Sequence, residues 1–164
     1  MKIACISDTH DNLEAVVKTF KRINQRKIDF VFHLGDIISP FTLNKIKEIY
    51  SGKLVAIFGN NDGEKQGLYE RAKSLNFEIY EPPFIYELKK IKFMLFHIYP
   101  ENYFAEIKGI DFLLFGHWHK VIHVRKENTI FLNPGEVCGY LYDKKTFAII
   151  DLKTKEVEII NIDE

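Results

Sequence analysis

The sequence predicts an α/β fold in which two sheets pack face to face with helices outside. Three observations lead to this prediction. The first part of the chain alternates short apolar runs with helical patterns, which is typical of parallel strands joined by helices. After Pro82 and Pro83, short apolar runs follow one another with few helical patterns between them. Polar side chains stand at the downstream ends of these runs, where open α/β sheets bind ligands.

The first strand and helix are predicted from a short apolar run followed by a helical pattern. Lys2 to Ile6 is mostly apolar and precedes polar residues, which predicts a buried strand that ends in a loop. Apolar residues then recur at helical spacing from Leu13 to Ile23. Asp11, with Glu14 three residues later, resembles a capping box and predicts where this helix begins.

Two further strands and a helix complete the first half of the fold. We predict strands over Asp29 to Leu34 and Lys53 to Phe58, with a helix from about Phe41 to Tyr50 between them. This order predicts parallel strands joined by right-handed crossovers. The polar residues after these strands should therefore gather at one edge of the sheet.

The second half of the chain is dominated by predicted strands. Helices are expected only within Glu64 to Leu75 and from Pro100 to Lys108, where proline suits a first turn. No linker-like stretch separates the halves, so we predict one domain over residues 1–164. The predicted strands are Phe84 to Leu88, Lys92 to Phe96, Phe112 to Phe115, His123 to Arg125, Thr129 to Leu132, Phe147 to Asp151 and Val157 to Ile162.

Composition and charge narrow the class of protein. With 46% hydrophobic residues and 14 phenylalanines, a chain of 164 residues can bury a core without disulfides, and its two cysteines suggest a reducing compartment. Lys plus Arg equals Asp plus Glu at 23 each, so no net field favours extended nucleic acid as a partner. The first apolar run is too short for a signal peptide or a membrane span. We expect a cytoplasmic protein without a membrane partner, and a homo-oligomer is compatible with this composition.

Five polar motifs carry the chemistry, each at the downstream end of an apolar run. Their carboxylate, amide and imidazole groups, without any thiolate, are the donors expected for a hydrolytic centre of Mn, Fe, Ni, Co or Zn. Each motif alone is a weak signal, and the ordered set of compatible donors predicts the metal centre. The motifs are Asp8-Thr9-His10, Gly35-Asp36, Gly59-Asn60-Asn61-Asp62, His97 and Gly116-His117-Trp118-His119.

The spacing of the first donors favours a pair of metal ions. Asp8 and His10 are two residues apart, and on irregular backbone both side chains can turn toward one ion. Asp36 follows a glycine that permits close approach of the backbone. Its two carboxylate oxygens could bridge a metal pair.

The later donors complete the set. His117 and His119 repeat the two-residue spacing, so that one imidazole can face each ion. Asn60 supplies a neutral oxygen that limits the negative charge of the site, and His97 adds a further imidazole. In their order, these motifs resemble those of the calcineurin-like metallophosphoesterase superfamily. The resemblance is strongest to its small single-domain phosphodiesterase branch, which also includes the retromer subunit of this fold.

This resemblance covers almost the whole chain and implies a fold, an activity and a ligand set. The implied fold is a four-layer α/β/β/α sandwich with two packed mixed sheets. The implied activity is a phosphodiesterase that uses two divalent ions, in which a hydroxide that bridges the ions attacks the phosphorus of a small phosphodiester. Asp36, Asn60 and His97 are expected to take part in catalysis. One metal would be bound by Asp8, His10, Asp36 and His119, and the other by Asp36, Asn60, His97 and His117.

This chain departs from the family pattern at two positions that should affect how it handles its substrate. Many members carry a histidine after the metal-binding asparagine, where it protonates the leaving oxygen, and this chain has Asn61 there. General acid catalysis is typically worth about 10² to 10⁴-fold, so its absence should slow esters with poor leaving groups most. The family's usual glycine after His97 is replaced by Ile98. The aromatic residues that follow could stack a base or aryl group, and we expect Tyr99, Tyr103 and Phe104, together with Asn61, to bind substrate.

Other residues near the motifs are expected to support the site. Asp62 could orient a neighbouring histidine. The resemblance extends to a late Asn-Pro-Gly turn close to the site, which places Asn133 and Gly135 beside the ligands. His33 and His123 lie within predicted strands, so we expect neither to bind metal.

Two other functions compete with a phosphodiesterase. The retromer subunit of this fold is regarded as a non-catalytic scaffold for protein partners, and the change at Asn61 makes a similar loss of activity conceivable. Retention of every proposed ligand argues against that reading. A nuclease would need a basic groove that the balanced charge does not indicate.

Overall fold

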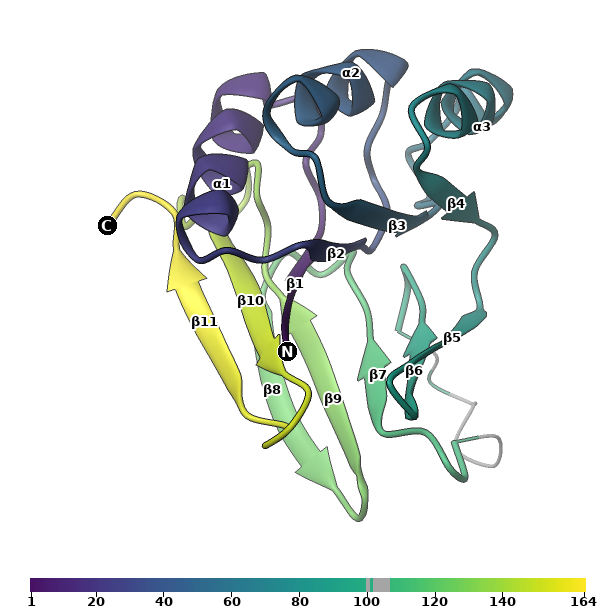
Figure 1. The fold of residues 1–164 in the computed structure, drawn as a ribbon, viewed down its shortest axis with the longest axis vertical. Helices are drawn as coiled ribbons and strands as arrows, with labels where there is room; N and C mark the ends of the chain where they lie inside the picture. Colours follow the sequence, from purple (N-terminus) through teal and green to yellow (C-terminus); the bar gives the residue numbers. More distant parts are fainter. Residues whose placement is uncertain (100, 102–106) are drawn as a thin grey trace.

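The computed structural model describes residues 1–99, 101 and 107–164. They form two mixed sheets, which confirms the predicted α/β fold (Figure 1). The first sheet has the strand order β11-β10-β1-β2-β3-β4 and the second the order β5-β6-β7-β9-β8. Three helices in the described residues pack against the outer face of the first sheet: α1 (Leu13–Gln25), α2 (Pro40–Ile49) and α3 (Lys65–Ser74).

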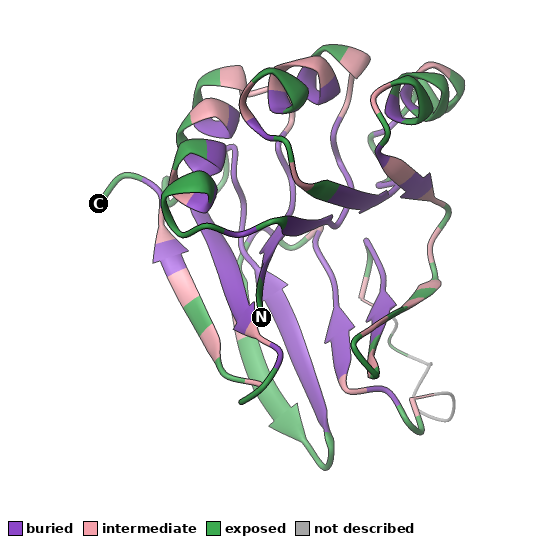
Figure 2. Ribbon diagram, viewed as in Figure 1, coloured by how far each residue is buried: buried purple, intermediate pink, exposed green. Residues whose placement is uncertain are grey.

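The strands of the two sheets are short, and those at the centre of each sheet are largely buried. Those of the first sheet are β1 (Lys2–Ile6), β2 (Phe30–His33), β3 (Lys53–Ile57), β4 (Glu78–Tyr80), β10 (Thr146–Asp151) and β11 (Val157–Asn161). Those of the second are β5 (Phe84–Leu88), β6 (Ile91–Leu95), β7 (Phe112–Leu114), β8 (Val121–Lys126) and β9 (Thr129–Pro134). Figure 2 shows buried strands in both sheets, whereas β8 and the outward faces of the helices are exposed.

Parallel pairing brings the polar motifs to one edge. Strands β1, β2, β3 and β4 pair in parallel, as the order of strands and helices predicted. Strands β6, β7 and β9 are also parallel to one another in the second sheet. Because parallel strands end on the same side of a sheet, the loops after β1, β2 and β3 lie together.

Alternation along each strand builds two layers of core. In β1, Ala4 and Ile6 belong to the apolar cluster beneath the helices, whereas Ile3 and Cys5 belong to the cluster between the sheets. Full burial of one such aliphatic side chain stabilises the fold by roughly 1.5–3 kcal/mol. The strands that carry the first motifs are therefore fixed on both faces, by the helices on one face and by the second sheet on the other.

The sequence predictions need correction at the start of α1 and at strand β4. The N-cap of α1 is Asn12, whose side-chain oxygen accepts from the amide of Ala15, and not Asp11 as part of a capping box. Asp11 instead accepts hydrogen bonds from the hydroxyls of Ser39 and Thr42 at the start of α2, because its backbone is turned out of the helix. Strand β4 was not predicted, since it spans only Glu78–Tyr80.

The outer face of the second sheet carries a third apolar cluster, formed by side chains such as Met94, Leu113 and Phe131. The helix predicted from Pro100 to Lys108, which would supply the fourth layer, falls largely outside the described residues. Among the described helices, none has the length and apolar character needed to cross a membrane.

Candidate metal centre

The loops after β1, β2 and β7 bring four of the predicted donors together. One ligand atom from each of Asp8, His10, Asp36 and His119 lies within 4.8 Å of the others. His10 Nε2 is 3.3 Å from Asp36 Oδ2, and His119 Nε2 is 3.4 Å from Asp8 Oδ1. These four residues are the set that the resemblance assigns to one metal.

Two atoms of this cluster are buried without a hydrogen-bond partner in the described part of the chain. They are Asp8 Oδ1 and His10 Nε2. A buried polar atom left unpaired typically costs about 1–3 kcal/mol, so native proteins rarely retain one without a ligand. A carboxylate oxygen and an imidazole nitrogen that face each other at 3.9 Å fit a divalent cation between them.

A second group of donors also meets Asp36. His97 Nε2 is 2.8 Å from Asn60 Oδ1 and 3.4 Å from Asp36 Oδ2. His117 is adjacent, with its ring centroid 5.3 Å from that of His97. The structure therefore also brings together the members of the second predicted set, with Asp36 common to both.

The tautomer of His97 follows from its partners. Its Nδ1 lies 2.7 Å from the carbonyl oxygen of Leu34, which can only accept, so Nδ1 carries the proton and donates. Nε2 faces two acceptors, Asn60 Oδ1 and Asp36 Oδ2, so a cation bound there would take the place of a proton and leave the ring neutral. Burial alone would lower the pKa of His97, but the adjacent carboxylate of Asp36 raises it.

Asp36 is held by groups from the loop after β3. The amide and the side-chain Nδ2 of Asn61 donate to its two oxygens at 2.9 and 2.8 Å. Although burial alone would raise it, the nearby rings of His10 and His97 and the hydrogen bonds from Asn61 hold the pKa of Asp36 well below its usual range. Asp36 is therefore an ionised, oriented carboxylate at the centre of the site.

Asp8 and Asp36 differ in their electrostatic surroundings. Burial raises the pKa of Asp8, against the opposing effect of Ser7, His97 and His119. The carboxylate of Asp36 raises the pKa of His10. A divalent cation would stabilise the ionised form of Asp8 and the neutral form of His10, which are the forms that bind metal.

We expected Asp62 to orient a histidine, and its contacts differ. Its buried carboxylate accepts hydrogen bonds from the backbone amides of Asp36, Ile38 and Gly59. These bonds join the loop after β2 to the loop after β3. Asp62 thus positions the backbone that carries Asp36 and Asn60.

Glu136 is a supporting residue whose role was not predicted. Its Oε2 lies 2.7 Å from Nδ1 of His119, so that nitrogen carries the proton and Nε2 is left free toward Asp8. Its oxygens also accept from the amides of Tyr140, Leu141 and Tyr142. Although burial alone would raise it, these donors hold the pKa of Glu136 below its usual range. Its position next to the Asn-Pro-Gly turn was the available signal.

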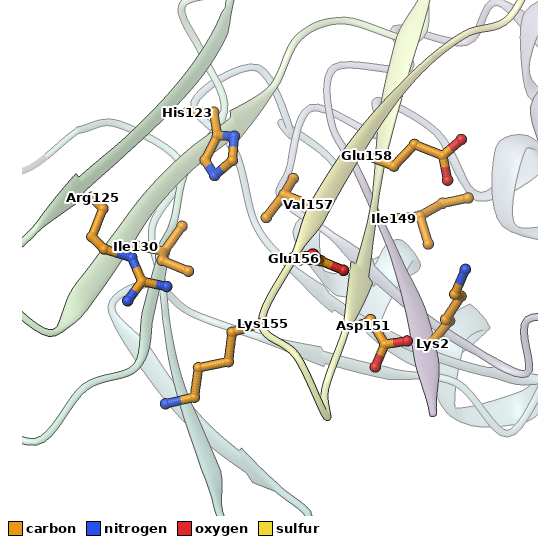
Figure 3. Close-up of a pocket in the computed structure, with 10 residues that line it drawn as sticks. All are labelled: Lys2, His123, Arg125, Ile130, Ile149, Asp151, Lys155, Glu156, Val157 and Glu158. Atoms are coloured by element: carbon orange, nitrogen blue, oxygen red, sulfur yellow. The ribbon is translucent and has the colours of Figure 1, made fainter.

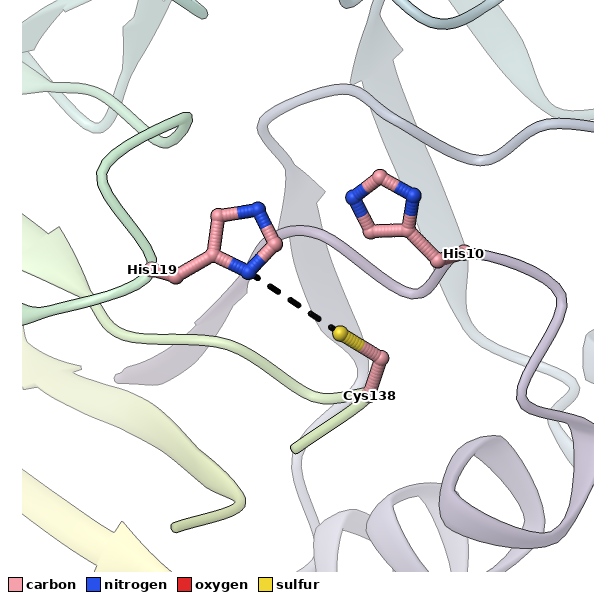
Figure 4. Close-up of side chains that lie close together, drawn as sticks. All are labelled: His10, His119 and Cys138. Atoms are coloured by element: carbon pink, nitrogen blue, oxygen red, sulfur yellow. Dashed lines mark hydrogen bonds between the residues drawn. The ribbon is translucent and has the colours of Figure 1, made fainter. Parts of the chain in front are cut away.

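Cys138 lies beside His10 and His119 in a second arrangement that could hold a cation (Figure 4). Its Sγ is 4.0 Å from His119 Nδ1 but 3.1 Å from Glu136 Oε2, to which the thiol donates. Burial and Glu136 raise the pKa of Cys138 to about 12. A protonated thiol is a poor ligand, so the four-donor cluster is the better cation site.

Many of the donors occupy unusual backbone conformations. Asp8, His10, Asp36, His117 and His119 all have positive φ, between 42° and 63°. Such left-handed conformations are uncommon for residues other than glycine and gather at functional sites. The fold holds these side chains in place through its loops at a conformational cost.

Asn133 and Gly135 lie where the late turn was expected to support the site. Asn133 is buried, and its Nδ2 donates to the carbonyl of Gly116, directly before the two histidines of the loop after β7. Its Oδ1 accepts from the amide of Gly135. Gly135 has φ +82°, and a Cβ there would lie 2.1 Å from Thr146 Oγ1, so glycine is required.

The excluded histidines are not among the clustered donors. His33 is fully buried, and its Nδ1 accepts from the amide of Gly35 at 3.2 Å. Nε2 therefore carries the proton and donates to Thr9 Oγ1 at 3.1 Å, and burial lowers the pKa of His33 to about 3. His123 is exposed on β8 and lines a separate hollow at the amino end of β1 (Figure 3).

The predicted aromatic wall is described only at Tyr99. Its ring packs 4.9 Å from Phe115 and 5.2 Å from Trp118, between ring centroids. Tyr99 thus belongs to the cluster on the outer face of the second sheet. Tyr103 and Phe104 lie outside the described residues.

Comparison with known proteins yields one consistent result. Residues 1–155 match the family model of the calcineurin-like phosphoesterase superfamily domain. A phosphodiesterase of Methanocaldococcus jannaschii is 33% identical over 160 residues, which make up 95% of this chain and 96% of the relative. The solved structure of a novel archaeal phosphodiesterase superposes with a TM-score of 0.91 at 31% identity, over 98% of this chain and 99% of that one.

A more distant neighbour shares the fold alone. Vps29 of Entamoeba histolytica, solved in complex with Zn²⁺, superposes with a TM-score of 0.68 at 17% identity. The match covers 99% of each chain. The same backbone arrangement therefore occurs in a protein related to this one only at low identity.

Proposed function

The chain belongs to the calcineurin-like phosphoesterase superfamily, and on this premise we propose that it is a phosphodiesterase that hydrolyses small phosphodiesters with two bound divalent metal ions. The observation that carries the proposal is the cluster of Asp8, His10, Asp36 and His119, in which two buried ligand atoms have no partner in the described part of the chain. These donor types fit the implied metals Mn, Ni, Fe, Co and Zn.

Each ion would be held by four residues. Asp8, His10, Asp36 and His119 would hold one, and Asp36, Asn60, His97 and His117 the other. When bound, such ions activate water for attack on phosphorus and neutralise the charge of the phosphate oxygens.

The remaining chemistry belongs to the chain itself. Glu136 and the carbonyl of Leu34 hold protons on Nδ1 of His119 and His97, which keeps both Nε2 atoms available. Asn61 orients Asp36 through its Nδ2. An amide cannot donate a full proton to a leaving oxygen, so we expect diesters with good leaving groups to react fastest.

The proposal is tested with stripped protein reloaded with Mn²⁺ or Ni²⁺. It should bind metal and hydrolyse bis(4-nitrophenyl) phosphate. His117→Ala should abolish turnover, whereas His123→Ala, the same change on the exposed face of β8, should retain it. If His117→Ala kept its activity as His123→Ala does, His117 would be excluded from the centre.

The same assay separates the rival functions. Bound metal without turnover of any diester would favour a protein-binding scaffold, and cleavage of polynucleotides would favour a nuclease. We also assign the protein to the cytoplasm, because both cysteines are buried free thiols, which suits a reducing compartment.

A further inference from the structure

A hollow of about 290 Å³ opens directly beside the second group of donors. Asn60 and His97 form part of its lining and are also the residues whose side chains meet at 2.8 Å in the centre. The rest of its wall is mostly apolar and comes from Phe58, Pro82, Pro83, Phe96 and Ile98. The hollow and the donors therefore form one continuous site.

We infer that this hollow is a substrate subsite that receives a flat aromatic ester group of the phosphodiester, such as an aryl ring or a nucleobase. The inference rests on the proposed function, because the phosphate must be bound at the donors for its ester group to reach the hollow. Ligand sites are typically about 300–1,000 Å³, so this volume suits one ring rather than a whole nucleotide.

The charges at the rim favour a neutral group. Lys65 and Glu81 are the charged residues in the lining, and the Lys65 ammonium donates to both Glu81 oxygens at 3.1 and 3.0 Å. The same ammonium lies 5.1 Å from the centroid of the Phe58 ring. Its charge is thus already partnered, and a second phosphate would find no unpaired cation in the described lining.

This subsite differs from the aromatic wall expected from the sequence. The Tyr99 ring is packed against Phe115 and Trp118 and does not line the hollow. Ile98, the residue that replaces the family's usual glycine, does line it and is 51% exposed. An isoleucine here adds apolar wall that glycine would lack, so Ile98 is the side chain that tests the inference.

The test compares two phosphonates that cannot be hydrolysed. Benzylphosphonate and methylphosphonate carry the same anionic head and differ in the ring, and calorimetry on Mn²⁺-loaded protein gives both affinities. We expect benzylphosphonate to bind about tenfold more tightly, a gain typical of burying an apolar group of this size. Ile98→Ala should reduce this preference at least threefold, and Ile98→Trp should also reduce it by occupying the hollow.

Ile85→Ala is the matched control, because Ile85 is 53% exposed and does not line the hollow. It should keep the preference of the unsubstituted protein. Equal affinity for the two phosphonates, or a preference that survives both Ile98 substitutions, would overturn the subsite while metal-dependent hydrolysis remained. Absence of binding by either phosphonate together with absence of diester hydrolysis would overturn the proposed function, and the subsite with it.

Discussion

The two ends of the strands in the first sheet carry the same residue types in opposite surroundings. At the carboxyl ends, Asp8 and Asp36 are fully buried, and their oxygens face histidines. At the amino end of β1, a hollow of about 550 Å³ is lined by Asp151, Glu158 and His123 among others (Figure 3). There the carboxylates are at least partly exposed.

The pairing of these charges differs as much as their burial. Glu158 forms an ion pair with Arg26 at 3.1 Å, and Asp151 accepts from the amide of Lys153 at 2.8 Å. Surface pairs of this kind contribute about 0–1 kcal/mol. Asp8, in contrast, keeps a buried oxygen without a hydrogen-bond partner in the described residues. Volume alone thus does not distinguish the proposed metal centre, whereas buried ligand atoms that lack partners do.

The largest effect should come from substituting the shared carboxylate. Asp36→Asn keeps the shape of the side chain and removes its negative charge, so we expect diester hydrolysis to fall more than about a hundredfold, beyond the loss typical of residues that only orient a ligand. Asp151→Asn makes the same change at the other end and should leave turnover within twofold. Hydrolysis rates and the amount of bound metal per chain are measured for both variants. Similar rates would contradict the difference proposed between the two ends of the sheet.

An intermediate effect should come from the carboxylate that orients His119. Glu136→Gln weakens the hold on Nδ1 of His119, so we expect metal affinity to drop about 10–100-fold. Glu158→Gln, which disturbs only an exposed ion pair, is the counterpart. A metal titration in the calorimeter measures the change in affinity, and a thermal melt verifies that both variants are folded. Unchanged metal affinity in Glu136→Gln would remove this residue from the site.

The smallest effect concerns stability in acid. Folded His33 stays neutral because burial lowers its pKa to about 3, whereas the unfolded chain takes up a proton near pH 6.5. The stability that His33 contributes is therefore present above pH 6.5 and is lost as the pH falls toward 3, by at most about 1.4 kcal/mol per pH unit.

Urea unfolding of metal-free protein at pH 7.5 and 4.5 tests this dependence. The unsubstituted protein should lose more stability between the two values than His33→Gln does. His123→Gln alters an exposed side chain and should behave like the unsubstituted protein. The same loss on acidification in His33→Gln would assign the acid sensitivity to other groups.

The sequence was sufficient for the parts of the fold that depend on local pattern. Apolar runs and helical spacing predicted the strands around Asp36 and Asn60, and parallel pairing then placed their loops together. Strand β4 was missed because three residues are too few for a period to emerge. Asp11 was mistaken for a cap because its actual partners, Ser39 and Thr42, lie at the start of another helix.

The predicted donors were easier to find than their supports. Ligand types and spacing are visible in the chain, and the structure gathers them. Glu136 was missed because its partner His119 is brought to it only by tertiary folding. The histidine contact predicted for Asp62 differs from its observed contacts for a related reason. A carboxylate can accept from backbone amides as readily as from histidines, and the residue type does not show which partner it has.

The left-handed loops have a consequence for how this protein can evolve. Residues other than glycine in that conformation each cost of order 1–3 kcal/mol, and five proposed donors share it. Glycine would relieve the torsional penalty at any of these positions while deleting the donor. Selection for thermal robustness alone would therefore favour glycine at these positions and tend to erase the proposed centre.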